Sequence, residues 1–264
     1  MTRYLRALYR LWKARRTNQR VFGEAINTVP TMCNAYSFAR TYTHTPPRAE
    51  DALSASMNPL WEYFQHHKEG PGIWKWEHYF DIYHRHFAHF VGQKVNILEI
   101  GIYSGGSLEM WRSYFGEKSH VYGVDIEVAC KAYENEHVSV FIGDQADRTF
   151  WHTFRQSVAG IDILIDDGGH TPEQQQTTLE EMLPYLRPGG VYLCEDMHGR
   201  TNSFAAFASS LVAELNCWNH DASRFHSSIH SIHFYPYLVI IEKHRVLPKK
   251  LAAPKQGTEW QPFL

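Results

Sequence analysis

The chain has 264 residues, of which 44% are hydrophobic and 20% charged, which suits one large α/β domain with an extension. Its four cysteines show no Cys-x-x-Cys pair and no zinc-site spacing, which argues against a disulfide-stapled secreted module and favours a reducing compartment. A net charge of -2 argues against a protein that coats nucleic acid, so we expect no nucleic-acid partner. No aliphatic run approaches the roughly 18 to 20 residues that span a bilayer, and we expect a cytoplasmic protein.

The first 20 residues are strongly basic. They hold seven basic residues and no acidic one, which leaves 19 basic against 28 acidic residues in the rest of the chain. Tyr4, Leu5, Leu8, Leu11 and Trp12 recur among these cations at helical spacing, so the segment is predicted to form a basic amphipathic helix. Three roles stay open for residues 1–20: a packing or oligomerisation arm, a helix for a membrane surface or a partner, and an organelle-targeting peptide.

Two further segments precede the regular part of the chain. Residues 21–57 are polar, and Pro46 and Pro47 break any helix there, so residues 1–57 are predicted as a basic helix and an extension. Residues 58–92 are rich in aromatic residues and compatible with helix. Five of their aromatic side chains fall near one helical face: Trp76, Tyr79, Phe80, Tyr83 and Phe87. Such a face indicates core packing, or a lid whose Tyr and His side chains reach into a pocket.

From residue 93 to residue 245, short apolar runs alternate with amphipathic stretches, as is typical of βα units and a parallel sheet. The predicted strands are Val95–Ile100, His120–Val124, Val138–Ile142, Ile161–Ile165, Val191–Cys194, Ser231–Phe234 and Leu238–Glu242. The predicted helices are Gly106–Phe115, Phe150–Ser157, Pro172–Leu186 and Asn202–Asn216. The last two strands are too close for a crossover helix, so we expect an antiparallel hairpin beside five parallel strands. Residues 246–264 are interpreted as a tail.

The first predicted strand runs into a glycine-rich turn that opens a helix. The turn reads Gly101-Ile-Tyr-Ser-Gly105-Gly106, and glycines there let the backbone approach a ligand closely. Tyr103 stands where a dinucleotide-binding Gly-x-Gly-x-x-Gly motif has its second glycine, and Glu99 is an odd neighbour for a pyrophosphate. The dinucleotide motif is therefore absent, and the turn by itself indicates either a ligand site or a purely structural turn.

Acidic residues follow four of the predicted parallel strands: Asp125, Asp144, Asp166, Asp167, Glu195 and Asp196. Asp125 is placed to accept hydrogen bonds from a ribose or to cap a helix. The carboxyl ends of parallel strands share one crevice, where like charges need a proton or a cation among them. Mg²⁺ is favoured because it prefers oxygen ligands. The alternative is that Asp166 caps the turn and Glu195 pairs with an arginine.

A histidine follows the same acidic motif. His170 lies three residues beyond Asp167, on the loop that leaves the fourth strand. Imidazole is the usual general base near neutral pH, so His170 is the predicted base. The chain has 17 histidines, and His78, His86 and His198 are rival candidates.

Together these motifs resemble class I S-adenosylmethionine-dependent methyltransferases, with most similarity to the metal-dependent sugar O-methyltransferases of macrolide antibiotic biosynthesis. The resemblance covers about residues 74–245 and implies a Rossmann-like sheet. It rests on Leu98-Glu-Ile-Gly-Ile through Gly106-Ser107-Leu108, on Gly123-Val-Asp125-Ile, on Gly143-Asp144-Gln145-Ala-Asp147, on Ile165-Asp-Asp-Gly-Gly-His170, and on Arg187-Pro-Gly-Gly-Val-Tyr with Glu195-Asp196. It also extends upstream to His78-Tyr79-Phe80.

The resemblance implies S-adenosylmethionine and Mg²⁺ as cofactors and gives each motif a role. Gly101 and the following glycines would hold the methionine part, Asp125 the ribose, and Asp144 and Gln145 would flank the adenine. The implied cofactor-binding residues are Glu99, Gly101, Ile102, Tyr103, Ser104, Gly105, Ser107, Asp125, Asp144, Gln145 and Asp167. The implied metal ligands are Asp167, Glu195 and Asp196, and the motif histidine, His170, would serve as base.

The implied reaction is Mg²⁺-dependent O-methylation of a sugar or another small-molecule diol. A metal-independent N-methyltransferase and a non-catalytic cofactor-binding protein of the same fold stay open as alternatives. The expected partner is a small-molecule substrate, with a glycosyl compound as one option, and a membrane surface for residues 1–20 and a second copy of the chain in a homo-oligomer stay open as further partners.

Overall fold

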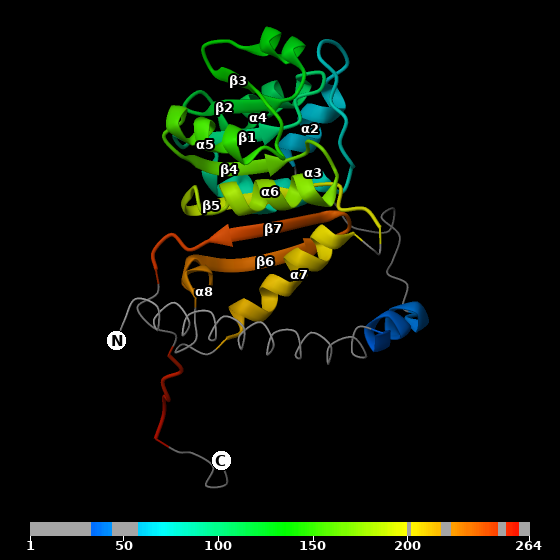
Figure 1. Ribbon diagram of the computed structural model, residues 1–264, viewed down its shortest axis with the longest axis vertical. Helices are drawn as coiled ribbons and strands as arrows, with labels where there is room; N and C mark the ends of the chain where they lie inside the picture. The colour runs from blue at the N-terminus through cyan, green and yellow to red at the C-terminus, as the bar shows by residue number, and fades with distance from the viewer. Residues whose placement is uncertain (1–32, 44–57, 200–201, 218–222, 248–251, 259–264) are drawn as a thin grey trace, which may run out of the picture. The chain divides into compact units, whose positions relative to one another are not determined.

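The computed structural model describes residues 33–43, 58–199, 202–217, 223–247 and 252–258 (Figure 1). The chain divides into two compact units, residues 1–55 and 56–264. In the first unit residues 33–41 are helical, while the basic helix predicted for residues 1–20 lies outside the described residues. Within the described ranges, no helix has both the length and the apolar character needed to cross a membrane.

The second unit is built on a seven-stranded sheet with the order β3-β2-β1-β4-β5-β7-β6. Its strands are β1 (Asn96–Ile100), β2 (His120–Asp125), β3 (Val138–Ile142), β4 (Ile161–Asp166), β5 (Leu186–Cys194), β6 (Ile229–Tyr235) and β7 (Leu238–Lys243). Strands β1 to β5 are parallel neighbours, whereas β7 runs antiparallel to both β5 and β6. The predicted arrangement of five parallel strands and a hairpin is confirmed.

Helices cover both faces of this sheet (Figure 1). Successive strand residues point to opposite faces, so Ile97 and Leu98 belong to two separate hydrophobic cores. One core includes α2 (Pro59–His66), α3 (Tyr79–Phe87) and α4 (Gly106–Phe115). The other includes α5 (Arg148–Ser157), α6 (Pro172–Met182) and α7 (Ser203–Leu215). Three short helices lie between the main elements along the chain: η2 (Ala88–Phe90), η3 (Val128–Tyr133) and α8 (Arg224–Ser228).

The aromatic stretch before the sheet packs into the first core. Tyr79, Phe80, Tyr83 and Phe87 on α3 are buried, whereas Trp76, just before the helix, is 47% exposed. The core-packing interpretation is therefore confirmed for the four helical residues. Two of them also carry hydroxyl groups to the sheet edge, as described below.

Most predicted boundaries agree within two residues, and two are wrong by four or five residues. The helix expected over Pro172–Leu186 ends at Met182. Pro184 has no backbone N–H for a further helical hydrogen bond, so the helix ends before it, although Leu183 still has helical φ and ψ angles. Strand β5 begins at Leu186 rather than Val191, because Leu186 pairs with Ile161 of β4 ahead of a register shift. The intervening residues 187–190 bulge out of the ladder.

The winding of the chain reverses at β1, which lies between β2 and β4. In open parallel sheets, ligands bind at the carboxyl ends of the strands at such a point. Backbone hydrogen bonds tie these ends together, from Gly101 N to Val124 O (2.8 Å), from Asp167 N to Ile100 O (3.0 Å) and from Glu195 N to Asp166 O (2.9 Å). The fold thus places the predicted motifs at one edge of the sheet.

Candidate active site

The glycine-rich turn after β1 packs directly against the loop after β4. Gly101 has a φ of +87°, and a Cβ there would lie 2.1 Å from the main-chain oxygen of Asp167. Gly105, with a φ of +78°, precedes α4 and faces the ring of Tyr133. Both positions require glycine, because the backbone conformation and the space exclude a side chain. The turn therefore brings two strand ends into contact.

Asp125, at the end of β2, holds this turn in shape. Its Oδ2 accepts hydrogen bonds from the N–H groups of Ile102 (2.8 Å) and Tyr103 (3.2 Å), and its Oδ1 accepts one from Glu127 (2.9 Å). Tyr103 has a φ of 47° and is mostly exposed. Each carboxylate oxygen has further lone-pair capacity. Asp125 thus braces the turn and still has acceptor capacity for a ligand.

A buried lysine that the sequence interpretation missed lies among the carboxylates. Lys75 Nζ lies 2.6 Å from Asp167 Oδ2, 3.2 and 3.3 Å from the two oxygens of Glu195, and 3.4 Å from Glu99 Oε1. Its side chain is 3% exposed. Burial lowers the pKa of Lys75, but the three carboxylates outweigh burial and raise it well above its usual value. One ammonium group therefore faces three carboxylates, and negative charge is in excess.

The sequence offered one signal for this lysine. Lys75 is the only basic residue of the Lys or Arg type between Lys68 and Arg85, and it stands between Trp74 and Trp76. A solitary cation in an aromatic segment, upstream of an acid-rich sheet edge, is a candidate counter-charge for that edge. Its partners are up to 120 residues away in the chain, so no local pattern could identify them.

Residues 70–76, which we call the strap, carry Lys75 across the start of α4. A Cβ on Gly106 would lie 2.3 Å from Pro71 O and 2.5 Å from Gly72 O. Next to Lys75, the indole Nε1 of Trp76 donates a hydrogen bond to Asp196 Oδ1 (3.0 Å). The strap therefore contacts the site both at the glycine turn and at the end of β5.

Glu99 and Glu195 are buried carboxylates that also have protein hydrogen-bond donors. Ser107 Oγ donates to Glu99 Oε2 (2.8 Å), and Tyr83 OH donates to Glu195 Oε1 (2.6 Å). Burial raises the pKa of both groups, and Lys75 opposes that rise. Glu99 Oε1 forms an ion pair with Lys75 Nζ at 3.4 Å but makes no hydrogen bond within the described part of the chain. A buried acceptor of this kind fits a site that gains a positively charged or N–H-bearing ligand.

Asp167, His170 and Asp196 form a second group at the same edge. One ligand-type atom of each lies within 4.8 Å of the others. His170 Nε2 is 3.7 Å from Asp196 Oδ2, and the imidazole is half-exposed. Asp196 Oδ1 also accepts a hydrogen bond from Tyr79 OH (3.0 Å). Two carboxylates and an exposed imidazole are able to bind a divalent cation or a polar substrate.

The predicted metal set is thus divided in the structure. Asp167 and Asp196 lie together with His170, whereas Glu195 is turned toward Lys75 and Tyr83. The alternative that Glu195 pairs with an arginine is wrong, because its cationic partner is Lys75. Asp167 belongs to both arrangements, because its Oδ2 contacts Lys75.

The remaining predicted residues at these strand ends are Asp166, Gln145 and Asp144, none of which belongs to the group of Asp167, His170 and Asp196. Asp166 is buried, and burial raises its pKa to about 7, although Gln145 Nε2 donates to its Oδ1 (2.9 Å) and opposes that rise. Gln145 Oε1 also accepts the N–H of Gly169 (2.5 Å), so this side chain braces the loop that carries His170. Asp144 is exposed, and its Oδ1 accepts a backbone hydrogen bond from two residues further on (2.8 Å).

The rival histidines lie differently. His198 Nε2 is 3.6 Å from Asp196 Oδ1, so it lies at the rim of the site. His78 Nε2 lies 3.1 Å from Pro236 O, in the turn of the hairpin. His86 contacts Glu242 and Tyr235, away from these carboxylates. Only His170 and His198 therefore approach Asp196 among the four candidates.

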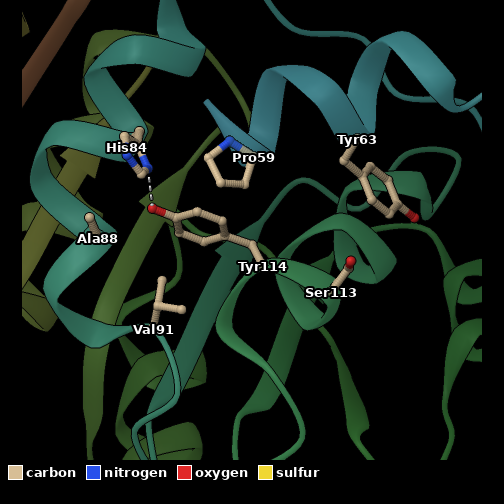
Figure 2. A pocket seen from close by; sticks show the side chains of 7 residues that line it. All are labelled: Pro59, Tyr63, His84, Ala88, Val91, Ser113 and Tyr114. Atoms are coloured by element: carbon tan, nitrogen blue, oxygen red, sulfur yellow. Dashed lines mark hydrogen bonds between the residues drawn. The ribbon is translucent and has the colours of Figure 1, made fainter. Parts of the chain in front are cut away.

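A surface pocket elsewhere on the unit does not include these residues. It has a volume of about 280 Å³ and is lined by Pro59, Tyr63, His84, Ala88, Val91, Ser113 and Tyr114. Figure 2 shows its mainly apolar walls and the contact between His84 and Tyr114, whose ring nitrogen and hydroxyl are 2.8 Å apart. The pocket lies over α2, α3 and α4 and has no acidic group, so it is not the site that the strand ends form.

Comparison with known proteins identifies the part of the chain that carries the site. Residues 98–197 match the family described as a methyltransferase domain. These residues form a methyltransferase domain. Glu99, Asp125, Asp167, His170 and Asp196 all belong to the methyltransferase domain, whereas the strap precedes it.

Curated relatives include demethylmacrocin O-methyltransferase of Streptomyces fradiae, which is 33% identical over 59% of this chain and 38% of its own length. They also include 8-demethyl-8-alpha-L-rhamnosyl tetracenomycin-C 2'-O-methyltransferase of Streptomyces olivaceus, which is 31% identical over 67% of this chain and 53% of its own length. This chain spans about half or less of the length of these relatives.

A similar solved structure is the MycE methyltransferase of the mycinamycin biosynthetic pathway, in complex with Mg, SAH and mycinamycin VI. The TM-score is 0.60 and the identity 27%, over 71% of this chain and 53% of that chain. The similarity reaches beyond the methyltransferase domain, since its share of this chain exceeds the matched residues 98–197.

Proposed function

We propose that the chain transfers a methyl group from S-adenosylmethionine to a hydroxyl of a sugar or another small-molecule diol. The observation that carries this proposal is the contact between the glycine turn and the loop of Asp167 and His170. A cofactor seated on the turn would lie next to a carboxylate and imidazole group suited to an alcohol. The named activities of the relatives, which are O-methyltransferases, support the same reaction.

The residues present fit the cofactor. The backbone of Gly101, Ile102, Tyr103, Ser104 and Gly105 forms the turn at the carboxyl end of β1, and side chains at the two glycines would displace the Asp167 loop and Tyr133, which pack against this turn. In the proposed complex this turn and Glu99 bind the amino-acid part, Asp125 accepts hydrogen bonds from the ribose, and the backbone near Asp144 and Gln145 flanks the adenine. Ser107 positions Glu99. The excess of carboxylates over ammonium groups favours a ligand with a positively charged sulfonium.

The residues also fit a divalent ion. Asp167 and Asp196 supply the oxygen donors that Mg²⁺ prefers, and Glu195 is the third proposed ligand, released from Lys75. When bound, Mg²⁺ supplies Lewis acidity that lowers the pKa of a substrate hydroxyl and fixes its position. A diol is the proposed substrate, because its two neighbouring hydroxyls would offer oxygen donors of the kind that Mg²⁺ prefers.

His170 is the proposed general base. It lies on the loop that follows Asp167, and its ring is accessible to a substrate. Its Nε2 is the atom nearest to Asp196, so that carboxylate can stabilise the imidazolium that forms when His170 takes a proton. The remaining work of the protein is to align the hydroxyl oxygen with the methyl group and to exclude water.

Cofactor binding can be tested by calorimetry with S-adenosylhomocysteine and with NAD⁺. We expect the first to bind and the second not to bind. Asp125→Ala should weaken S-adenosylhomocysteine binding roughly 10-fold to 100-fold, because a charged acceptor is lost and the turn loses its brace. Glu127→Ala removes an exposed acid two residues away and is the control. Tighter binding of NAD⁺ would contradict the proposal.

The metal requirement is tested by following S-adenosylhomocysteine release with a panel of glycosides and diols. We expect turnover with Mg²⁺ and none after EDTA treatment, and Asp167→Asn should greatly reduce turnover without unfolding the protein. Full activity of protein that contains no metal by elemental analysis would instead support a metal-independent methyltransferase.

A further inference from the structure

A second cluster of metal-ligand side chains lies between α3 and the β6–β7 hairpin. It consists of His86 on α3, His233 on β6 and Glu242 on β7, and one ligand-type atom of each lies within 4.8 Å of the others. The rings of His86 and His233 are 4.7 Å apart. None of these residues has a part in the proposed methyl transfer, and three separate elements bring them together.

The two imidazoles converge on the two oxygens of one carboxylate. His86 Nδ1 is 2.7 Å from Glu242 Oε1, and His233 Nε2 is 3.8 Å from Glu242 Oε2. Two imidazole nitrogens with a carboxylate oxygen are a donor set for zinc-type ions, in contrast to the oxygen-rich sets that Mg²⁺ prefers. The chemistry of this cluster is therefore different from that of Asp167 and Asp196.

Neighbouring hydroxyl groups fix the orientation of the candidate ligands. His86 Nε2 lies 2.9 Å from Tyr235 OH, so the ring can donate there when Nδ1 exchanges its contact with Glu242 for a metal ion. Ser231 Oγ donates to Glu242 Oε2 (2.9 Å) and lies 3.0 Å from His233 Nε2. The Tyr235 contact is an outer hydrogen bond of the kind that sets the tautomer and direction of a ligand at built metal sites, whereas Ser231 contacts the candidate ligand atoms themselves and would give way to the ion.

The cluster is both anchored and accessible. His86 is 4% exposed, whereas Glu242 and His233 retain partial exposure. An ion thus has an entry path, and water can complete the coordination of three protein ligands. Glu242 lies four residues along β7 from Leu238, roughly 13 Å from the hairpin turn that contacts the methyltransferase site.

We propose that His86, His233 and Glu242 bind a divalent transition-metal ion of the zinc class. The ion replaces the direct contacts among the three side chains and joins α3 to the hairpin. Helix α3 also carries Tyr79 and Tyr83, whose hydroxyls bond to Asp196 and Glu195. Bound metal therefore stabilises the helix that supports the carboxylates of the candidate active site.

The test uses the full chain without an affinity tag, first freed of metal with a chelator. Titration with Co²⁺ should give the visible absorption of a four-coordinate site, and Zn²⁺ should displace it. At a 100-fold excess of free Zn²⁺ over its Kd, the Tm should rise by roughly 5 to 10 °C. His233→Ala and Glu242→Gln should each abolish the Co²⁺ absorption and the rise in Tm.

Two control variants separate this site from other metal binding. His230→Ala removes an exposed histidine of the same strand and should leave the absorption unchanged. Asp167→Asn changes the other cluster and should also leave it unchanged. Because His233 is partly exposed and His86 keeps Glu242 as partner, His233→Ala should fold, which circular dichroism can verify. An absent Co²⁺ band, or a band that His230→Ala reduces as much as His233→Ala does, overturns the proposal.

Discussion

At the scale of single residues, Lys75 determines the charge balance of the candidate active site. Its ammonium group is buried against Glu99, Asp167 and Glu195. Removal of one partner from a buried ionic cluster leaves uncompensated charge in a low-dielectric environment. The strap is also attached to the sheet edge through this residue. Lys75 thus links the charge balance of the site to the position of the strap.

We expect Lys75→Met to lower the free energy of unfolding by about 3–5 kcal/mol, because the buried carboxylates lose their counter-charge. Urea denaturation at neutral pH measures this loss. Lys131→Met is the matched control: Lys131 pairs with Glu134 at an exposed position, where solvent screening leaves an ion pair with little effect on stability. Equal losses in the two variants would show that Lys75 is not a buried counter-charge.

His170→Ala separates the base from the metal ligands. We expect kcat to fall by roughly 10²–10⁴, the usual contribution of a general base, while the Kd for Mg²⁺ measured by calorimetry changes little. His198→Ala, which removes the other imidazole near Asp196, should have a much smaller effect on kcat. Loss of Mg²⁺ binding in His170→Ala would identify this histidine as a ligand instead.

The residue types at the site were predictable, but several of their contacts were not. The alternation of strands and helices placed Asp125, Asp167 and Asp196 at one sheet edge, and the structure confirms that placement. Lys75 was missed because its partners are remote in the chain and a local pattern carries no such information. The brace that Gln145 provides to Gly169 depends on side-chain direction, which hydrophobic periodicity does not specify.

At the scale of elements, the strap and α4 fit together through Gly106. The Cβ of an alanine at this position would meet the main-chain oxygens of Pro71 and Gly72. We expect Gly106→Ala to displace the strap and weaken the docking of Lys75, although alanine is the better helix former. Limited proteolysis in the strap should become faster than in wild type.

Ser113→Ala, the control for Gly106→Ala, also places an alanine on α4 but at an exposed position, and it should leave the rate of proteolysis in the strap unchanged. Equal cleavage of Gly106→Ala and wild type would mean that the strap does not depend on this contact.

Element boundaries show where sequence patterns suffice. The start of α6 is marked by a capping box of Thr171 and Gln174 and by Pro172 at the first helical position. These are strong signals for a helix start, and α6 begins at Pro172 as predicted. The start of β5 at Leu186 was not predicted, because the sequence Arg187-Pro-Gly-Gly that follows is typical of a turn. Pairing of Leu186 with Ile161 overrides that local preference, and the glycines and proline are accommodated in a bulge.

At the scale of the whole molecule, the basic first 20 residues make a separate prediction. If they bind a membrane surface, the full chain should bind vesicles of anionic lipid in a salt-sensitive way. A chain that begins at residue 21 should lose vesicle binding and keep its affinity for S-adenosylhomocysteine. Co-sedimentation with anionic and neutral vesicles measures the difference. Absence of binding by the full chain would favour the packing or oligomerisation role.

The brace that Asp125 provides has a thermodynamic consequence for ligand capture. The N–H groups of Ile102 and Tyr103 are already fixed by this carboxylate, so the turn has its shape before any ligand arrives. A preorganised loop loses little conformational entropy on association, and more of the interaction energy appears as affinity. The same rigidity limits the range of ligands, because a ligand of another shape would require the turn to give up hydrogen bonds that it already has.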